Sequence, residues 1–167
     1  KHGSDFRVPP PPAFDSPAYA EAFNEALRLG GDGVVTPTER TYEQTQIGIY
    51  WAYDGAPALC APPRLYNQMV THIAKQKNTH GIELARLLVL LNVGLADAGV
   101  SSWESKYHYR LWRPITAIRE ADTAGGGIGD GNPDTKGDLD FLPLGALASN
   151  LNGPNFTPPF PAYPSGH

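Results

Sequence analysis

The chain has 167 residues, of which 41% are hydrophobic and 18% are charged. This balance predicts a globular chain with one sizeable core and excludes a disordered one. The net charge of −4 leaves no electrostatic footprint for nucleic acid or an anionic membrane, so any bound anion must be attracted by a local cluster of cations. The single cysteine, Cys60, excludes a framework of disulfides within the chain.

Residues 1–15 are predicted to form an arm or linker ahead of a helical domain over residues 16–167. The consecutive prolines Pro9 to Pro12 favour an extended polyproline conformation. The start carries no apolar stretch of the kind found in a secretory signal. The compartment is therefore left open, with secreted and periplasmic locations among the alternatives.

Helix signals then follow one another along the chain. Ser16-Pro17 supplies an N-cap and a first-turn proline, and Gly30-Gly31 ends that helix. The capping pattern Thr36-Pro37-Thr38-Glu39 predicts a second, mostly buried helix that stops at Asp54-Gly55. Apolar residues at helical spacing predict a third helix over residues 63–77.

A fourth helix is expected from about Thr79 to Gly99. It is apolar nearly all round in its centre, which predicts a core helix. The longest apolar run, Leu84 to Val93, is interrupted by Arg86 and Asn92. Because a bilayer span needs about 18 apolar residues, no membrane span is expected.

A fifth helix is predicted from Ser101 or Ser102 to Glu120, with a kink at Pro114. A loop rich in glycine and aspartate follows over residues 124–136, and a short helical piece is expected around 139–148. The chain shows no stretch in which apolar and polar residues alternate, so no strand is predicted. The fold class is therefore predicted to be all-α, with long Pro/Gly-rich loops.

Two cations in the fifth helix form the first candidate site. Lys106 and Arg113 are seven residues apart, which on a single helix would place them two turns apart on one face. Like charges on one stripe favour an anion between them, held by the fork of the arginine and the point charge of the lysine. The alternative is a charged, solvated helix face.

The second candidate site is Pro164-Ser165-Gly166-His167. The serine hydroxyl and the glycine amide are donors suited to an oxyanion, and a histidine moves protons near neutral pH. The alternative is an ordinary turn.

Together, a Lys, six residues, Arg-Pro and a later Pro-Ser-Gly-His resemble the superfamily of vanadium-dependent haloperoxidases and type-2 phosphatidic acid phosphatases. Other segments resemble the chloroperoxidase-type branch: Trp51 to Gly55, Pro62 to Gln68, Asp97-Ala98-Gly99, Trp103 and Pro158 to Tyr163. The resemblance covers most of residues 37–167 and implies part of a helical bundle. A third family motif, Ser-Arg, five residues, His, does not occur in the chain.

The resemblance implies a vanadate cofactor. Lys106, Arg113, Ser165 and Gly166 would hydrogen-bond its oxygens, and His167 would be the acid–base residue. Lys106 would also withdraw charge as the O–O bond of hydrogen peroxide breaks. The histidine that ligates vanadium belongs to the absent third motif, so no metal ligand is expected in this chain.

By the same resemblance, Trp103 and Phe160 would form a halide pocket, and Asp54 would orient one of the site's arginines. The implied substrates are hydrogen peroxide, halide and small organic compounds. The remaining C-terminal part of the protein would be a required partner, as a continuation or a second chain, and a homo-oligomer stays open. The alternatives are an acid phosphatase of the same superfamily and a non-catalytic fragment or inactive homologue.

Overall fold

The computed structural model describes residues 2–52, 62–145 and 157–166. Within these ranges every regular element is a helix, and the one extended pairing is an isolated bridge between Gly31 and Pro143. The predicted all-α class is confirmed.

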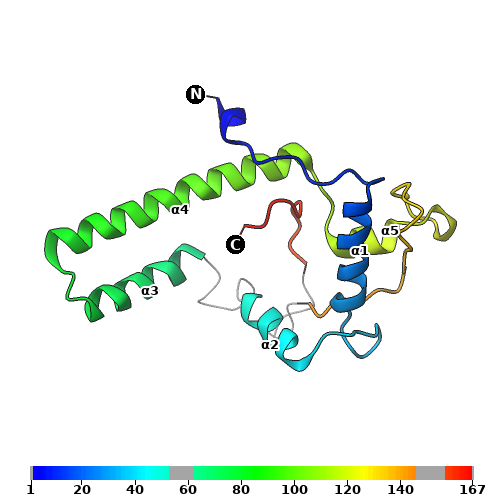
Figure 1. The fold of residues 1–167 in the computed structure, drawn as a ribbon, viewed down its shortest axis with the longest axis horizontal. Helices are drawn as coiled ribbons and strands as arrows, with labels where there is room; N and C mark the ends of the chain where they lie inside the picture. The colour runs from blue at the N-terminus through cyan, green and yellow to red at the C-terminus, as the bar shows by residue number, and fades with distance from the viewer. Residues whose placement is uncertain (1, 53–61, 146–156, 167) are drawn as a thin grey trace.

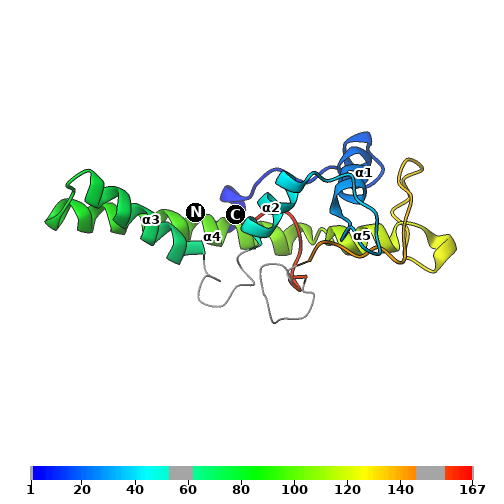
Figure 2. The same cartoon turned by 90° about the horizontal axis from the view of Figure 1, so that it is seen from below.

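The helices form a compact group and a projecting hairpin (Figure 1). Helix α3 (Pro62–Gln76) runs antiparallel to the long α4 (Gly81–Tyr109), and the two extend away from α1 (Pro17–Gly30) and α5 (Pro114–Glu120). The turned view in Figure 2 shows the same separation. The remaining elements are α2 (Tyr42–Trp51) and the 3₁₀ turns η1 (Gly3–Phe6) and η3 (Thr123–Gly125).

A small core joins α1 to α5. Its buried members come from α1, from α5 and its C-cap, and from the chain after the Gly/Asp-rich loop of residues 124–136: Tyr19, Phe23, Ala117, Ile118, Ala121 and Phe141. Arg119 donates two hydrogen bonds to the Phe141 carbonyl, at 2.9 and 2.7 Å. These hydrogen bonds tie the chain around Phe141 to α5 at the core.

The predicted ends of α1 are confirmed, whereas the predicted start of the second helix is wrong. Ser16 caps α1, which ends at Gly30. Helix α2 begins at Tyr42, because Thr41 accepts from the Gln44 amide and the Gln44 side chain accepts from the Thr41 amide. Thr36 is buried elsewhere, where its hydroxyl accepts from the Leu142 amide at 2.7 Å. Helix α2 has no buried residue, so the expectation of a mostly buried helix also fails.

Helix α4 differs from prediction in two ways. It continues through Gly99 to Tyr109, since one interior glycine costs only about 1 kcal/mol. It is also largely uncovered: its buried residues are Ser105 and Lys106, so it is not a core helix among the described residues. Its more-than-half-exposed aliphatic side chains are Ile82, Val89, Leu90, Val93 and Val100.

The stretch Gly81–Glu120 contains an 18-residue window with a mean hydropathy of 1.5, none of it buried. By length and composition this stretch is able to cross a membrane, and the expectation of no membrane span stays a prediction. A core helix of a soluble protein passes the same test. Hydropathy therefore identifies a surface that needs an apolar partner without identifying the partner.

Side-chain amides hold the hairpin together. Asn67 of α3 and Asn92 of α4 exchange two hydrogen bonds, at 3.0 and 2.9 Å. These two hydrogen bonds link α3 to α4 on the exposed side of the hairpin.

The expected short helix around residues 139–148 is absent over 139–145, and residues 146–148 lie outside the described ranges.

We expect Ile118→Ala to lower the free energy of unfolding by about 2–5 kcal/mol, because Ile118 is only 1% exposed in the α1–α5 core. Urea unfolding measures the change. The matched control is Ile128→Ala, since Ile128 is 77% exposed and should cost about 0.5 kcal/mol or less. Equal losses in the two variants would contradict this description of the core.

Candidate functional site

Lys106 lies in the last turns of α4, and only 1% of its surface is exposed. Its ammonium donates hydrogen bonds to three backbone carbonyls of the C-terminal segment: Pro161 at 3.3 Å, Ala162 at 3.1 Å and Pro164. A buried ammonium has three protons to satisfy, and these carbonyls meet that need. Lys106 thereby ties the segment that carries Ser165 and Gly166 to α4.

Arg113 reaches the same segment from a different element. Its Nε donates to the Phe160 carbonyl at 2.6 Å, and its guanidinium carbon lies 4.5 Å from the centre of the Phe160 ring. A guanidinium over an aromatic face is a favourable cation–π arrangement. The Leu111 carbonyl, two residues before, accepts from the Ala162 amide at 2.9 Å.

The prediction that Lys106 and Arg113 share one helix face is wrong. Helix α4 ends where Arg110 takes a left-handed conformation, with φ 52°. Arg113 is extended, with ψ 150°, and is the N-cap of α5, whose first residue is Pro114. Proline favours an extended residue before it and the first position of a helix, so Pro114 starts a helix rather than kinking one. A turn between two helices, and not a stripe on one, brings the cations to the same segment.

The electrostatics of the two cations favour a nearby anion. Burial, and then the positive charge of Arg113, lower the pKa of Lys106, and burial lowers the pKa of Arg113. The ion pairs among the described residues are Arg7–Glu104 and Arg28–Glu39, so neither cation has a carboxylate partner there. A buried lysine and a half-buried arginine without a carboxylate partner among the described residues supply positive charge that fits a tetrahedral oxyanion such as vanadate.

Trp103 and Phe160 lie beside these cations. Their ring centres are 5.5 Å apart, and the Lys106 ammonium is 5.8 Å from the Trp103 ring and 5.7 Å from the Phe160 ring. Gly166 approaches Trp103 so closely that a Cβ there would lie 3.2 Å from the indole. A side chain at this position would require the indole to move by a few tenths of an ångström.

The structure thus brings together Trp103, Lys106, Arg113, Phe160 and Gly166. Ser165, directly before Gly166 in the same segment, is exposed. The other two predicted site residues, Asp54 and His167, lie outside the described residues.

The N-terminal arm is a part of this region that the sequence did not reveal. The Tyr163 hydroxyl donates to the Pro9 carbonyl at 2.8 Å, and the Tyr109 hydroxyl donates to the Val8 carbonyl at 2.7 Å. The two tyrosine rings lie edge to face, 5.9 Å apart. Arg7 pairs with Glu104 of α4 nearby. No local pattern could predict these contacts, because the partners are about a hundred or more residues apart.

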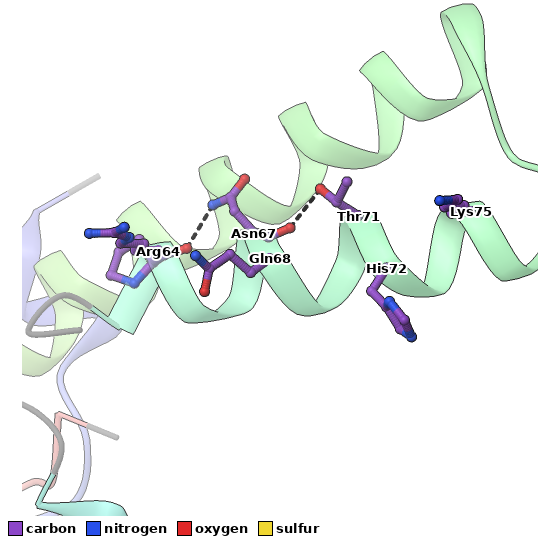
Figure 3. A pocket seen from close by; sticks show the side chains of 7 residues that line it. Arg64, Asn67, Gln68, Thr71, His72 and Lys75 are labelled. Atoms are coloured by element: carbon purple, nitrogen blue, oxygen red, sulfur yellow. Dashed lines mark hydrogen bonds between the residues drawn. The ribbon is translucent and has the colours of Figure 1, made fainter. Parts of the chain in front are cut away.

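Another hollow lies away from these residues, on α3. It measures about 670 Å³ and is lined by residues of α3 alone, among them Arg64, His72 and Lys75. Figure 3 shows its side chains spaced along that single helix. A hollow formed by one helix face does not converge polar groups on a ligand, so it is not the candidate site.

Comparison with known proteins identifies relatives of the chain. Residues 86–167 match the family described as VCPO second helical-bundle domain. An alignment of 164 residues, covering 93% of the chain, is 40% identical to vanadium chloroperoxidase from Curvularia inaequalis. The chain spans about a quarter of the length of that relative.

We expect Tyr163→Phe to loosen the C-terminal segment, because the hydrogen bond to the Pro9 carbonyl is lost at a cost of about 1 kcal/mol. Hydrogen exchange of residues 160–166 should become several-fold faster. Tyr107→Phe is the control, since the structure shows no hydrogen bond of the Tyr107 hydroxyl among the described residues. Unchanged exchange in the Tyr163 variant would show that the arm does not hold the segment.

Proposed function

We propose that this chain, which is 40% identical to a vanadium chloroperoxidase over 93% of its length and matches a vanadium chloroperoxidase domain over residues 86–167, supplies the anion-binding residues of an enzyme that oxidises halide with hydrogen peroxide. The hypohalous acid formed would halogenate small organic compounds. The observation that supports this function is the pair of desolvated cations, Lys106 and Arg113, without a carboxylate partner among the described residues.

The cofactor proposed for this site is vanadate. When bound, it acts as a Lewis acid that activates peroxide. Arg113 has terminal guanidinium nitrogens beyond the Nε that bonds the Phe160 carbonyl, and these would fork onto two oxygens of the anion. Ser165 and Gly166 would donate from the hydroxyl and the backbone amide. The Gly166 packing against Trp103 would hold that amide in place.

Lys106 has a more constrained part in this proposal. Its three protons are committed to the carbonyls of Pro161, Ala162 and Pro164, so it must release at least one of them to donate to the anion. The charge of Lys106 would then offset the negative charge that develops on the leaving oxygen as the O–O bond of hydrogen peroxide breaks. His167 would be the acid–base residue that transfers a proton to this oxygen.

Trp103 and Phe160 would provide the halide position. Their rings lie within 6 Å of the Lys106 ammonium, and a large, weakly hydrated anion is attracted to a place that is both apolar and cationic. Asp54 would orient an arginine of the site.

The rest of the protein is the partner that we propose for this chain. The relative is about four times as long as the aligned part, and the exposed aliphatic face of α4 offers it a docking surface. The vanadium-ligating histidine is proposed to lie in that other part, as a continuation or as a second chain.

We expect the full-length protein to brominate a phenol dye only when vanadate, peroxide and bromide are all present. Arg113→Ala should lower kcat/KM by about 10²-fold or more, because it removes donors to the developing charge. Arg110→Asn is the matched control, since it removes an exposed neighbouring cation and asparagine tolerates the left-handed conformation of Arg110. Hydrolysis of a phosphate ester by the wild type, with no bromination, would indicate the phosphatase alternative instead.

The pH dependence of vanadate binding should report the ionisation of Lys106. Because burial and the charge of Arg113 lower the pKa of Lys106, its positive charge is lost as pH rises through a range below that of an ordinary lysine, and anion affinity should fall over that range. Lys106→Arg should move this loss to higher pH, since a guanidinium keeps its proton. Direct titration of vanadate binding at several pH values, with Lys75→Arg as an exposed control, measures the shift. Identical profiles for wild type and Lys106→Arg would contradict the assignment.

A further inference from the structure

A second cavity lies behind the candidate site. It measures about 230 Å³ and is half enclosed by the N-terminal arm, α1, α5 and the two segments that carry the site residues. Trp112, which precedes Arg113, and Tyr163, which precedes Pro164, both line it. The cavity therefore borders the backbone of the site without including its cations.

The walls of this cavity are apolar and aromatic. Tyr19 and Phe23 of α1 face it together with Trp112 and Tyr163, and Pro11 and Pro12 of the arm form another side. Aromatic walls favour an aromatic guest, because edge-to-face and offset contacts between rings add to the gain from burial.

The hydroxyl of Tyr19, one of the lining residues, accepts a hydrogen bond but donates none among the described residues. The Tyr19 hydroxyl accepts from the Trp112 indole nitrogen at 3.0 Å, and among the described residues it donates to no acceptor. Tyr19 is only 8% exposed, and burial raises its pKa, so the proton stays on the oxygen. A hydroxyl in an apolar wall whose proton has no acceptor among the described residues can donate to a ligand that offers one.

The volume limits the size of the guest. A dry apolar cavity of about 150 Å³ binds benzene, whereas drug-sized ligands occupy pockets of about 300–1,000 Å³. A cavity between these values admits one ring with a small substituent.

We propose that this cavity binds a single-ring aromatic compound that carries one hydrogen-bond acceptor, with the Tyr19 hydroxyl as its donor. Binding here needs neither vanadate nor the residues of the anion site. It is therefore independent of the function proposed above.

Acetophenone is the probe, and the full-length protein labelled with ¹⁵N-tryptophan is the sample. Saturating acetophenone should shift the Trp112 indole N–H resonance, assigned with Trp112→Phe, because an acceptor on the Tyr19 hydroxyl polarises the bond that this hydroxyl receives from the indole. Tyr19→Phe should weaken binding about two- to tenfold. No saturable shift of this resonance would overturn the proposal.

A variant that fills the cavity provides a second test. Ala22 is an exposed residue of α1 that lines the cavity, so Ala22→Leu should block entry without disturbing the core and should weaken binding at least about tenfold. Ala18→Leu is the matched control, one turn earlier on the same helix, exposed and outside the lining. Wild-type affinity in Ala22→Leu would also overturn the proposal.

Discussion

The buried ammonium of Lys106 is the contact on which the candidate site depends. It is buried and has no carboxylate partner among the described residues. Three backbone carbonyls of residues 161–164 accept its hydrogen bonds instead. Hydrogen bonds from a charged donor contribute about 1.5–3 kcal/mol each, so they hold the C-terminal segment against α4. The same contacts would set the cost of the anion binding proposed for Lys106, because its three protons are already donated to carbonyls.

The N-terminal arm supports this arrangement from the other side. Its carbonyls at Val8 and Pro9 accept from Tyr109 on α4 and Tyr163 on the C-terminal segment. Lys106 and the arm thus bind the same two elements at separate points. A segment of prolines contributes to this support because its extended conformation costs little entropy to order. The cavity lined by Tyr19 and Trp112 lies under that arm.

The apolar surface of α4 needs a partner that the described residues do not contain. Its aliphatic residues predict burial, yet those from Ile82 to Val100 include several that are more than half exposed. The α3–α4 pairing through Asn67 and Asn92 sets the shape of the hairpin and leaves this face open. Because the chain spans about a quarter of the length of its relative, the remaining part of the protein is the partner that we propose for this face.

The sequence by itself determined the all-α class and the limits of α1 and α3, because capping and helical periodicity are local properties. Motif spacing also predicted an anion site, which stays a prediction. Only the tertiary structure decided how Lys106 and Arg113 meet. Sequence spacing assumed one helix, whereas the left-handed Arg110 and the extended residue before Pro114 divide it into two. The partners of Lys106, Arg113 and Tyr163 come from residues 47 to 154 positions away. Such contacts depend on how the whole chain packs, and no local pattern encodes them.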